Sequence, residues 1–173
     1  MTDLRCEVWV TTPYHLQRFE DLMDRTSVIN RLRGTYSLPE GFPRTKLFRA
    51  GQPPLEMPVV MLSAGDLTIN SEGLVYSHNP KPRYAELRDL SFSTPIEHLE
   101  IALAQFDYAP VRWGNLPFIS FRVRGLDVDP VLLTASGVGP FTFQIRRRTK
   151  RLFAAMVSAG ATPLPSNNRW RGP

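Results

Sequence analysis

The first residues of the chain alternate between the two faces of an extended backbone. One face carries Leu4, Cys6, Val8 and Val10, and the other carries Arg5, Glu7, Trp9 and Thr11. This period of two predicts a half-buried β-strand. Thr12 and Pro13 then form a typical helix start, and apolar residues recur at helical spacing as far as Gly34. The pattern predicts one helix of about five turns.

Proline and glycine dominate the next segment, residues 35–58, which holds five prolines and two glycines. Proline is excluded from helix interiors and from central strands, so we expect a surface connection without regular structure. The connection is either a functional loop or a linker that separates an N-terminal part from a C-terminal β domain.

Short strands separated by turns are predicted for the middle of the chain. Residues 59–62, 67–70 and 74–76 form a meander, with turns at 64–66 and 72–73. A proline-containing loop covers 78–83. Two further strands are expected around 87–92 and 96–103, although residues 97–105 also contain good helix formers.

The last third of the chain combines strands with one helix. Residues 118–124, 131–133 and 141–145 are predicted strands, and 136–140 form a turn. A helix is expected from Thr149, a plausible cap, to Gly160. It places Leu152, Phe153, Met156 and Val157 on one face. The tail from Thr162 onward is expected to be loosely ordered.

This element order resembles the bacterial pleckstrin-homology-like (PH-like) barrel over residues 57–160. The meander at 67–76 and the run at 141–145, leading directly into the last helix, carry the resemblance. It implies an α+β, mainly β fold: an antiparallel PH-like barrel or roll capped by a C-terminal helix, with an N-terminal strand and long helix. The domains are then an N-terminal strand-helix extension and Pro-rich connection at 1–56, the β domain at 57–160, and a tail at 161–173.

The resemblance implies a binding scaffold for peptides, proteins or lipid headgroups, and no chemistry. Phosphoinositide-binding members carry several basic residues in the loop between their first two strands. The equivalent stretch here, residues 63–66, holds no base. Lipid recognition is therefore the weaker expectation.

Composition indicates what kind of protein this is and in which compartment it is expected. The 173 residues include 42% apolar and 21% charged side chains, the range of an ordinary globular protein. The single cysteine, Cys6, excludes an intrachain disulfide, and the charged N-terminus is unlike a signal peptide. We expect one folded unit in the cytoplasm.

Positive charge is concentrated near the C-terminus. Residues 1–100 hold 11 Lys and Arg against 13 Asp and Glu, whereas 101–173 hold 10 against 3. The candidate polyanion-binding residues are the basic run Arg146, Arg147, Arg148, Lys150 and Arg151. A compositional preference for arginine explains the run equally well. The predicted helix start also places these cations where the helix dipole is unfavourable to them.

Two smaller groups are further candidates. His78, Lys81, Arg83 and Tyr84 surround the proline-containing loop and are either a ligand rim or a polar turn. Arg122 and Arg124 lie on the exposed face of their strand, with Trp113 nearby in sequence, a mixture that suits single-stranded nucleic acid.

No motif in the sequence proposes catalysis. A phosphate-binding loop, a dinucleotide fingerprint and a nucleophile elbow are all absent, and His15, His78 and His98 have no metal-ligand spacing. We expect no enzyme, cofactor or metal. The leading hypothesis is a module that binds a protein or peptide through a sheet edge or the groove beside the last helix. The alternatives are a nucleic-acid-associated protein and, more weakly, a peripheral binder of anionic membranes.

Overall fold

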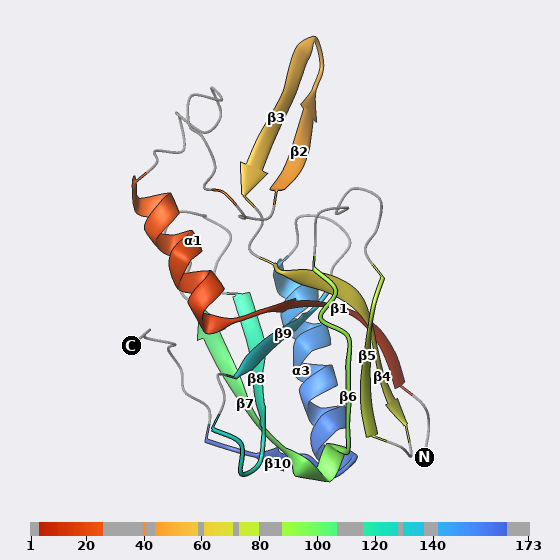
Figure 1. Cartoon of the computed structure of the whole chain (residues 1–173). Coiled ribbons are helices and arrows are strands. Elements are labelled where there is room, and N and C mark those ends of the chain that lie inside the picture. The colour runs from red at the N-terminus through yellow and green to blue at the C-terminus, as the bar shows by residue number, and fades with distance from the viewer. Residues whose placement is uncertain are drawn as a thin grey trace.

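The fold is one large sheet that curves around a C-terminal helix (Figure 1). The computed structural model describes residues 4–25, 40, 44–58, 61–70, 73–79, 88–106, 116–127, 130–136 and 142–165. Eight strands form the sheet in the order β10-β7-β8-β9-β1-β4-β5-β6, and β2 and β3 form a separate hairpin. The fold class is therefore α+β and mainly β, as predicted.

The N-terminal strand lies in the middle of the sheet. β1 (Leu4–Thr11) pairs antiparallel with β4 on one side and with β9 on the other. The first residues thus belong to the same sheet as the strands after residue 57 and do not form a separate extension. Hydrophobic alternation predicts a strand but carries no information about its partners, which is why the domain division missed this.

The helix after β1 begins where predicted. α1 (Pro13–Arg25) starts after Thr12, and the backbone N–H of His15 donates to Thr12 Oγ1 at 3.2 Å, the expected capping bond. Leu16 and Phe19 on its inner side are buried. The remainder of the predicted helix lies outside the described residues.

The proline-rich segment contains regular structure, contrary to prediction. β2 (Arg44–Arg49) and β3 (Gln52–Pro58) form an antiparallel hairpin that projects from the rest of the fold (Figure 1). Gly51 adopts φ +70° in the turn, and the register shifts between Leu47 and Arg49. Prolines are tolerated at a bulge and at the open edges of a two-stranded ribbon, so their number did not exclude strands.

Two of the three strands of the predicted meander are present, whereas residues 61 and 62 of the strand predicted at 59–62 are not in a strand. β4 (Ser63–Asn70) runs straight through residues 64–66 and forms a hairpin with β5 (Gly73–His78), which in turn pairs with β6 (Phe92–Thr94). The predicted turn at 64–66 is therefore wrong. Gly65 is there because a Cβ would come within 2.1 Å of the Ser77 carbonyl oxygen, a close backbone approach that also favours glycine.

Three consecutive antiparallel strands confirm the predictions at 96–103, 118–124 and 131–133, whereas residues 88–91 of the strand predicted at 87–92 are not in a strand. β7 (Leu99–Phe106), β8 (Leu116–Val123) and β9 (Val131–Ala135) pair in sequence order, and a short 3-10 helix, η2 (Ile96–His98), precedes β7. Ile119 and Phe121 of β8 are buried, whereas Arg122, and Arg124 just after the strand, are exposed, as the alternation predicts. Phe118, on the same face as the arginines, is fully buried, so the alternation does not hold along the whole strand.

The last helix is longer than predicted. α3 (Thr142–Ser158) includes the residues predicted as a strand at 141–145, apart from residue 141, which lies outside the described part of the chain. Thr149 is therefore a buried mid-helix residue and not a cap. Five alternating residues fit either structure, and here the apolar stripe continues back through Ile145 at helical spacing. The basic run consequently lies beyond the first turn, which removes the conflict with the helix dipole.

The predicted helix end is confirmed, and the tail is partly ordered. Gly160 adopts φ +117°, and the N–H of Ala161 donates to the Met156 carbonyl at 3.0 Å. Thr162 and Pro163 then form β10 (Thr162–Pro163), parallel to β7. The prediction of a loose tail from Thr162 is therefore wrong for this strand.

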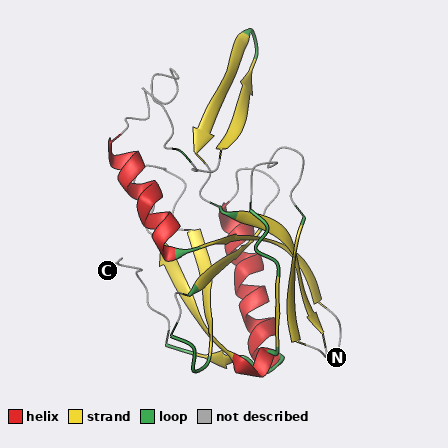
Figure 2. Ribbon diagram, viewed as in Figure 1, coloured by secondary structure: helices red, strands yellow, loops and turns green. Residues whose placement is uncertain are grey.

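The core fills the concave face of the sheet. Leu152 and Met156 of α3 pack among buried residues of β1, β4, β5, β7, β8 and β9. The sheet is open, yet its halves approach one another around α3 (Figure 2). The ring of Phe92 on β6 lies 5.3 Å from that of Phe121 on β8. Among the described residues, no helix is long and apolar enough to cross a membrane.

Candidate binding groove between β1 and α3

The first half of β1 has a different environment from the second. β4 pairs with residues Leu4 to Val10, but β9 pairs only with Val8 to Thr11. The last contact on the β9 side is a 2.8 Å hydrogen bond from the Ser136 N–H to the Glu7 carbonyl. Within the described part of the chain, residues 4–6 thus have a neighbouring strand on one side only.

A pocket of about 370 Å³ lies at this position, between β1 and α3. We call it the β1/α3 groove. Its lining comprises Leu4, Arg5, Cys6 and Glu7 of β1, Ser136 after β9, and Arg148, Arg151, Leu152 and Ala155 of α3. The groove brings together two of the predicted basic residues, Arg148 and Arg151, with residues that no sequence pattern singled out.

Helical spacing explains why these α3 residues share one side. Arg148 and Leu152 are four apart, and so are Arg151 and Ala155, so each pair lies along one strip of the helix. The two arginines therefore occupy the end of the strip toward the N-terminus of α3. Leu152 and Ala155 form its apolar continuation.

Three hydrogen-bond contacts attach this part of α3 to the end of β9 and to Ser136 after it. The N–H of Ala135 donates to Thr149 Oγ1 at 3.1 Å, and Thr134 Oγ1 lies 3.2 Å from the same atom. Arg148 Nη1 donates to the Ser136 carbonyl at 3.0 Å. Thr149 is fully buried. The contacts of the neighbouring Thr149 hold this turn of α3 in place, and the bond to Ser136 holds the Arg148 guanidinium.

The charges of the groove are unequally compensated. Arg5 forms an ion pair of 2.8 Å with Asp66, which raises the pKa of the Arg5 guanidinium through a hydrogen bond and Coulomb attraction. Arg151 has no hydrogen-bond or ion-pair partner in the described structure. Among the lining residues that the structure describes, Glu7 is the single carboxylate against three arginines, so they carry an excess of positive charge.

The only cysteine of the chain lies in this groove. Burial raises the pKa of the Cys6 thiol, and the nearby Arg148 only partly offsets that effect. Cys6 Sγ donates a weak hydrogen bond of 3.4 Å to the Glu7 carbonyl. The thiol is therefore protonated at neutral pH, unlike the thiolate of a nucleophilic cysteine.

The remaining members of the basic run face solvent. Arg146, Arg147 and Lys150 are exposed, and Arg146 has a partner of its own. None of the three is part of the lining of the groove. Among the described residues, no group of three or more His, Cys, Asp or Glu side chains is arranged to hold a metal ion.

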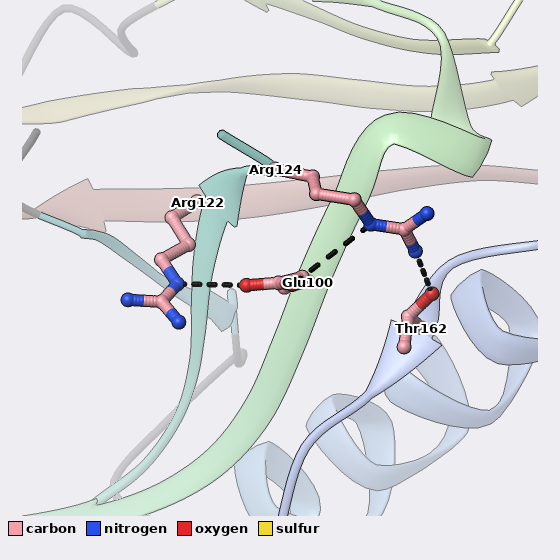
Figure 3. A network of polar contacts seen from close by, with 4 residues as sticks. All are labelled: Glu100, Arg122, Arg124 and Thr162. Atoms are coloured by element: carbon pink, nitrogen blue, oxygen red, sulfur yellow. Dashed lines mark hydrogen bonds and ion pairs between the residues drawn. The ribbon is translucent and has the colours of Figure 1, made fainter. Parts of the chain in front are cut away.

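Arg122 on β8 and Arg124 just after its end, which we call the β8 arginines, form a separate network (Figure 3). Arg122 Nε donates to Glu100 Oε2 at 2.9 Å, and Arg124 Nε lies 3.8 Å from Glu100 Oε1. Arg124 also donates to Thr162 Oγ1 on β10. One carboxylate thus partly neutralises two arginines and ties β10 to the edge of the sheet. Trp113 lies outside the described residues.

The predicted loop rim is described only at His78. Lys81, Arg83 and Tyr84 lie outside the described residues. His78 ends β5, and its Nδ1 lies 3.0 Å from Ser63 Oγ, which is 2.6 Å from the hydroxyl of Tyr76. Burial raises the pKa of Tyr76 to about 12. Because Ser63 is fully buried, this series of hydrogen bonds supports the core, and its serine is not an accessible nucleophile.

Sequence reasoning missed Leu4, Cys6, Ser136 and Ala155 as site residues. The alternation of β1 does predict that Leu4 and Cys6 face inward. It cannot predict that β9 ends before reaching them, because strand pairing depends on distant parts of the chain. Comparison with protein family models, curated proteins and solved structures finds no match to this chain.

Proposed function

We propose that the protein is a non-catalytic binding module that recognises a protein or peptide segment in the β1/α3 groove. The observation that carries the proposal is the groove itself, which lies where residues 4–6 of β1 have a strand neighbour on one side only within the described ranges. An extended peptide can contribute main-chain contacts to such a strand and place alternate side chains in an adjacent pocket.

The size of the groove suits an anchor of a larger interface. At about 370 Å³ it is in the lower range of ligand pockets and accommodates a few side chains. Specific protein complexes bury much more surface, and their energy is concentrated in a few buried anchors. We therefore assign the groove to anchoring side chains of a partner.

The proposal includes two finer expectations. A PH-like architecture is supported by the β4–β5 hairpin and by the C-terminal helix, but not by an open sheet that has β1 at its centre. A cytoplasmic location is supported by the presence of only one cysteine.

A pair of neighbouring alanines allows a matched test. Ala155 lines the groove, whereas Ala154 is exposed on another side of α3. Random peptides displayed on phage are selected on the immobilised full chain and then measured against Ala155→Trp and Ala154→Trp. Filling the groove should weaken the selected peptides by about tenfold or more, the effect of losing one anchor contact. Ala154→Trp should leave their affinity unchanged.

Circular dichroism and thermal unfolding show whether each variant folds, and the smaller substitution Ala155→Gln replaces Ala155→Trp if the latter does not. Equal binding of the selected peptides to both alanine variants would contradict the proposal. So would a selection that yields no binding peptide.

A nucleic-acid-associated role is the second candidate. It is supported by the exposure of Arg146, Arg147, Arg148, Lys150 and Arg151 within six residues of α3. Titration of generic DNA and RNA with increasing salt tests it. Binding that weakens steeply with salt and disappears in Arg147→Glu/Arg151→Glu favours this role, and no binding at low salt removes it. Co-sedimentation with anionic liposomes tests the weaker membrane alternative.

A further inference from the structure

We infer that the β1/α3 groove selects a peptide segment in which an acidic residue and an apolar residue are two positions apart. This inference rests on the proposed function and adds the chemistry of the ligand. It follows from the polarity of the groove, from the placement of its arginines and from the spacing between its two ends.

The groove has a cationic end and an apolar end. Arg148 reaches the Ser136 carbonyl, and Ser136 itself bonds to Glu7, so the arginines meet β1 near Glu7. Farther along α3 toward its C-terminus, Leu152 and Ala155 line the groove together with Leu4. A ligand that fits both ends carries a negative group and an apolar group.

The two arginines suit a carboxylate. The guanidinium of Arg148 is already held in place by its 3.0 Å bond to Ser136, which leaves its other N–H groups available for an acceptor. Arg151, three residues later on the same side of α3, has no polar partner in the described structure. Arginine forms strong paired hydrogen bonds with carboxylates.

The acidic groups nearby do not cancel this charge. Asp66 is engaged with Arg5 at 2.8 Å, and it lies outside the lining of the groove. Arg148 and Arg151 therefore face only Glu7 within the lining. The exposed Arg147 and Lys150 add to the positive potential around the opening.

The spacing of the two ends matches an extended peptide that runs along α3 and contacts the edge of β1 where the two elements cross (Figure 1). Residues four apart on α3 are separated by about 6 Å along the helix axis, the offset from Arg148 to Leu152 and from Arg151 to Ala155. Side chains two positions apart in a β-strand lie on one face and are separated by about 6.6 Å. An acidic residue at one position and an apolar residue two positions away can therefore engage both ends together.

This geometry favours a peptide over a nucleic acid. A nucleic acid presents regularly spaced phosphates and requires a continuous cationic track. In the groove the arginine pair is followed directly by Leu152 and Ala155, which offer nothing to a second phosphate.

Fluorescein-labelled nonapeptides with a threonine background provide the test. The first probes carry Glu-Thr-Leu or Leu-Thr-Glu at the centre, since either chain direction is compatible with the groove. The matched probes carry Gln-Thr-Leu or Leu-Thr-Gln, which remove the charge, and Glu-Leu-Thr or Leu-Glu-Thr, which place the two groups on opposite faces. Affinities for the full chain are measured by fluorescence anisotropy.

The better acidic probe should bind about tenfold more tightly than its glutamine and adjacent-position counterparts, the effect of one charge-assisted hydrogen bond or one anchor. Arg151→Gln should reduce the preference for glutamate over glutamine to about twofold or less. Arg147→Gln, which removes the same charge from an exposed residue outside the groove, should retain it. Arg148→Lys provides a second variant that keeps the charge and loses the paired geometry.

The possible failures are distinguishable. If Ala155→Trp abolishes the binding of displayed peptides but glutamate and glutamine probes bind equally well, the proposed function stands and the inferred selectivity is wrong. Equal losses in Arg151→Gln and Arg147→Gln would also overturn the inference, because they indicate a diffuse charge effect. If no displayed peptide depends on Ala155, the proposed function itself fails.

Discussion

Two surfaces of this protein carry pairs of arginines that look alike in the sequence and differ in their surroundings. The β8 arginines, Arg122 and Arg124, share the carboxylate of Glu100 and link β10 to the sheet (Figure 3). On α3, Arg148 and Arg151 line a groove, and only Arg148 has a described partner, a backbone carbonyl. The first pair has its charge partly neutralised within the fold, whereas the second keeps its charge available to a ligand.

The difference shows that exposure and charge are insufficient to identify a binding surface. The side chains of Arg122 and Arg124 are 53% and 55% exposed, and both were candidates on sequence grounds. The carboxylate that contacts both of them, Glu100, is 22 residues from Arg122 along the chain. The net charge that a ligand meets therefore depends on contacts that only the folded chain defines.

The largest expected effect is on the unfolding free energy, when the hydrogen bond that attaches α3 to the end of β9 is removed. Thr149→Val keeps the shape of the side chain but leaves the buried N–H of Ala135 without its acceptor. An unsatisfied buried donor costs about 1–3 kcal/mol of unfolding free energy. Urea unfolding measures the loss, and Ser158→Ala, an exposed change on the same helix, is the control. A loss no larger than that of the control would show that Thr149 does not fix α3.

A smaller effect on the unfolding free energy is expected when the Glu100 carboxylate beside the β8 arginines is removed. Glu100→Gln should alter the unfolding free energy by less than about 1 kcal/mol, because exposed ion pairs contribute little. It should nevertheless release the charge of Arg122 and Arg124, so that the variant elutes from heparin at higher salt.

Glu97→Gln is the matched control, since Glu97 is exposed and has no ion pair with the described residues. Both substitutions remove one negative charge. Elution of the two variants at the same salt concentration would indicate that Glu100 does not neutralise the β8 arginines and would remove the contrast between the two surfaces.

Local patterns predicted the features that depend on neighbouring residues. The strand of β1, the capped start of α1 at Thr12, the alternation of β8 from Ile119 to Arg122 and the helix end at Gly160 all follow from short stretches of sequence.

Features that depend on distant partners were missed. Gly65 looked like a turn residue, but it lies in a strand where the Ser77 carbonyl approaches it. Thr149 looked like a helix cap, but it bonds to the end of β9 from the middle of α3. The groove requires both that β9 ends at Ala135 and that α3 returns beside β1, and neither condition is encoded in the residues that line it.

The most direct test of the binding groove uses Cys6, the only thiol in the chain and a lining residue. Because burial raises the pKa of this thiol, iodoacetamide alkylation is best followed at about pH 9, where part of it is ionised and the arginines stay charged. A peptide selected on the full chain should slow alkylation of Cys6 by about tenfold when it occupies about nine tenths of the protein, because the rate follows the unoccupied fraction. An unchanged rate while anisotropy shows the peptide bound would place the binding site elsewhere and contradict the account.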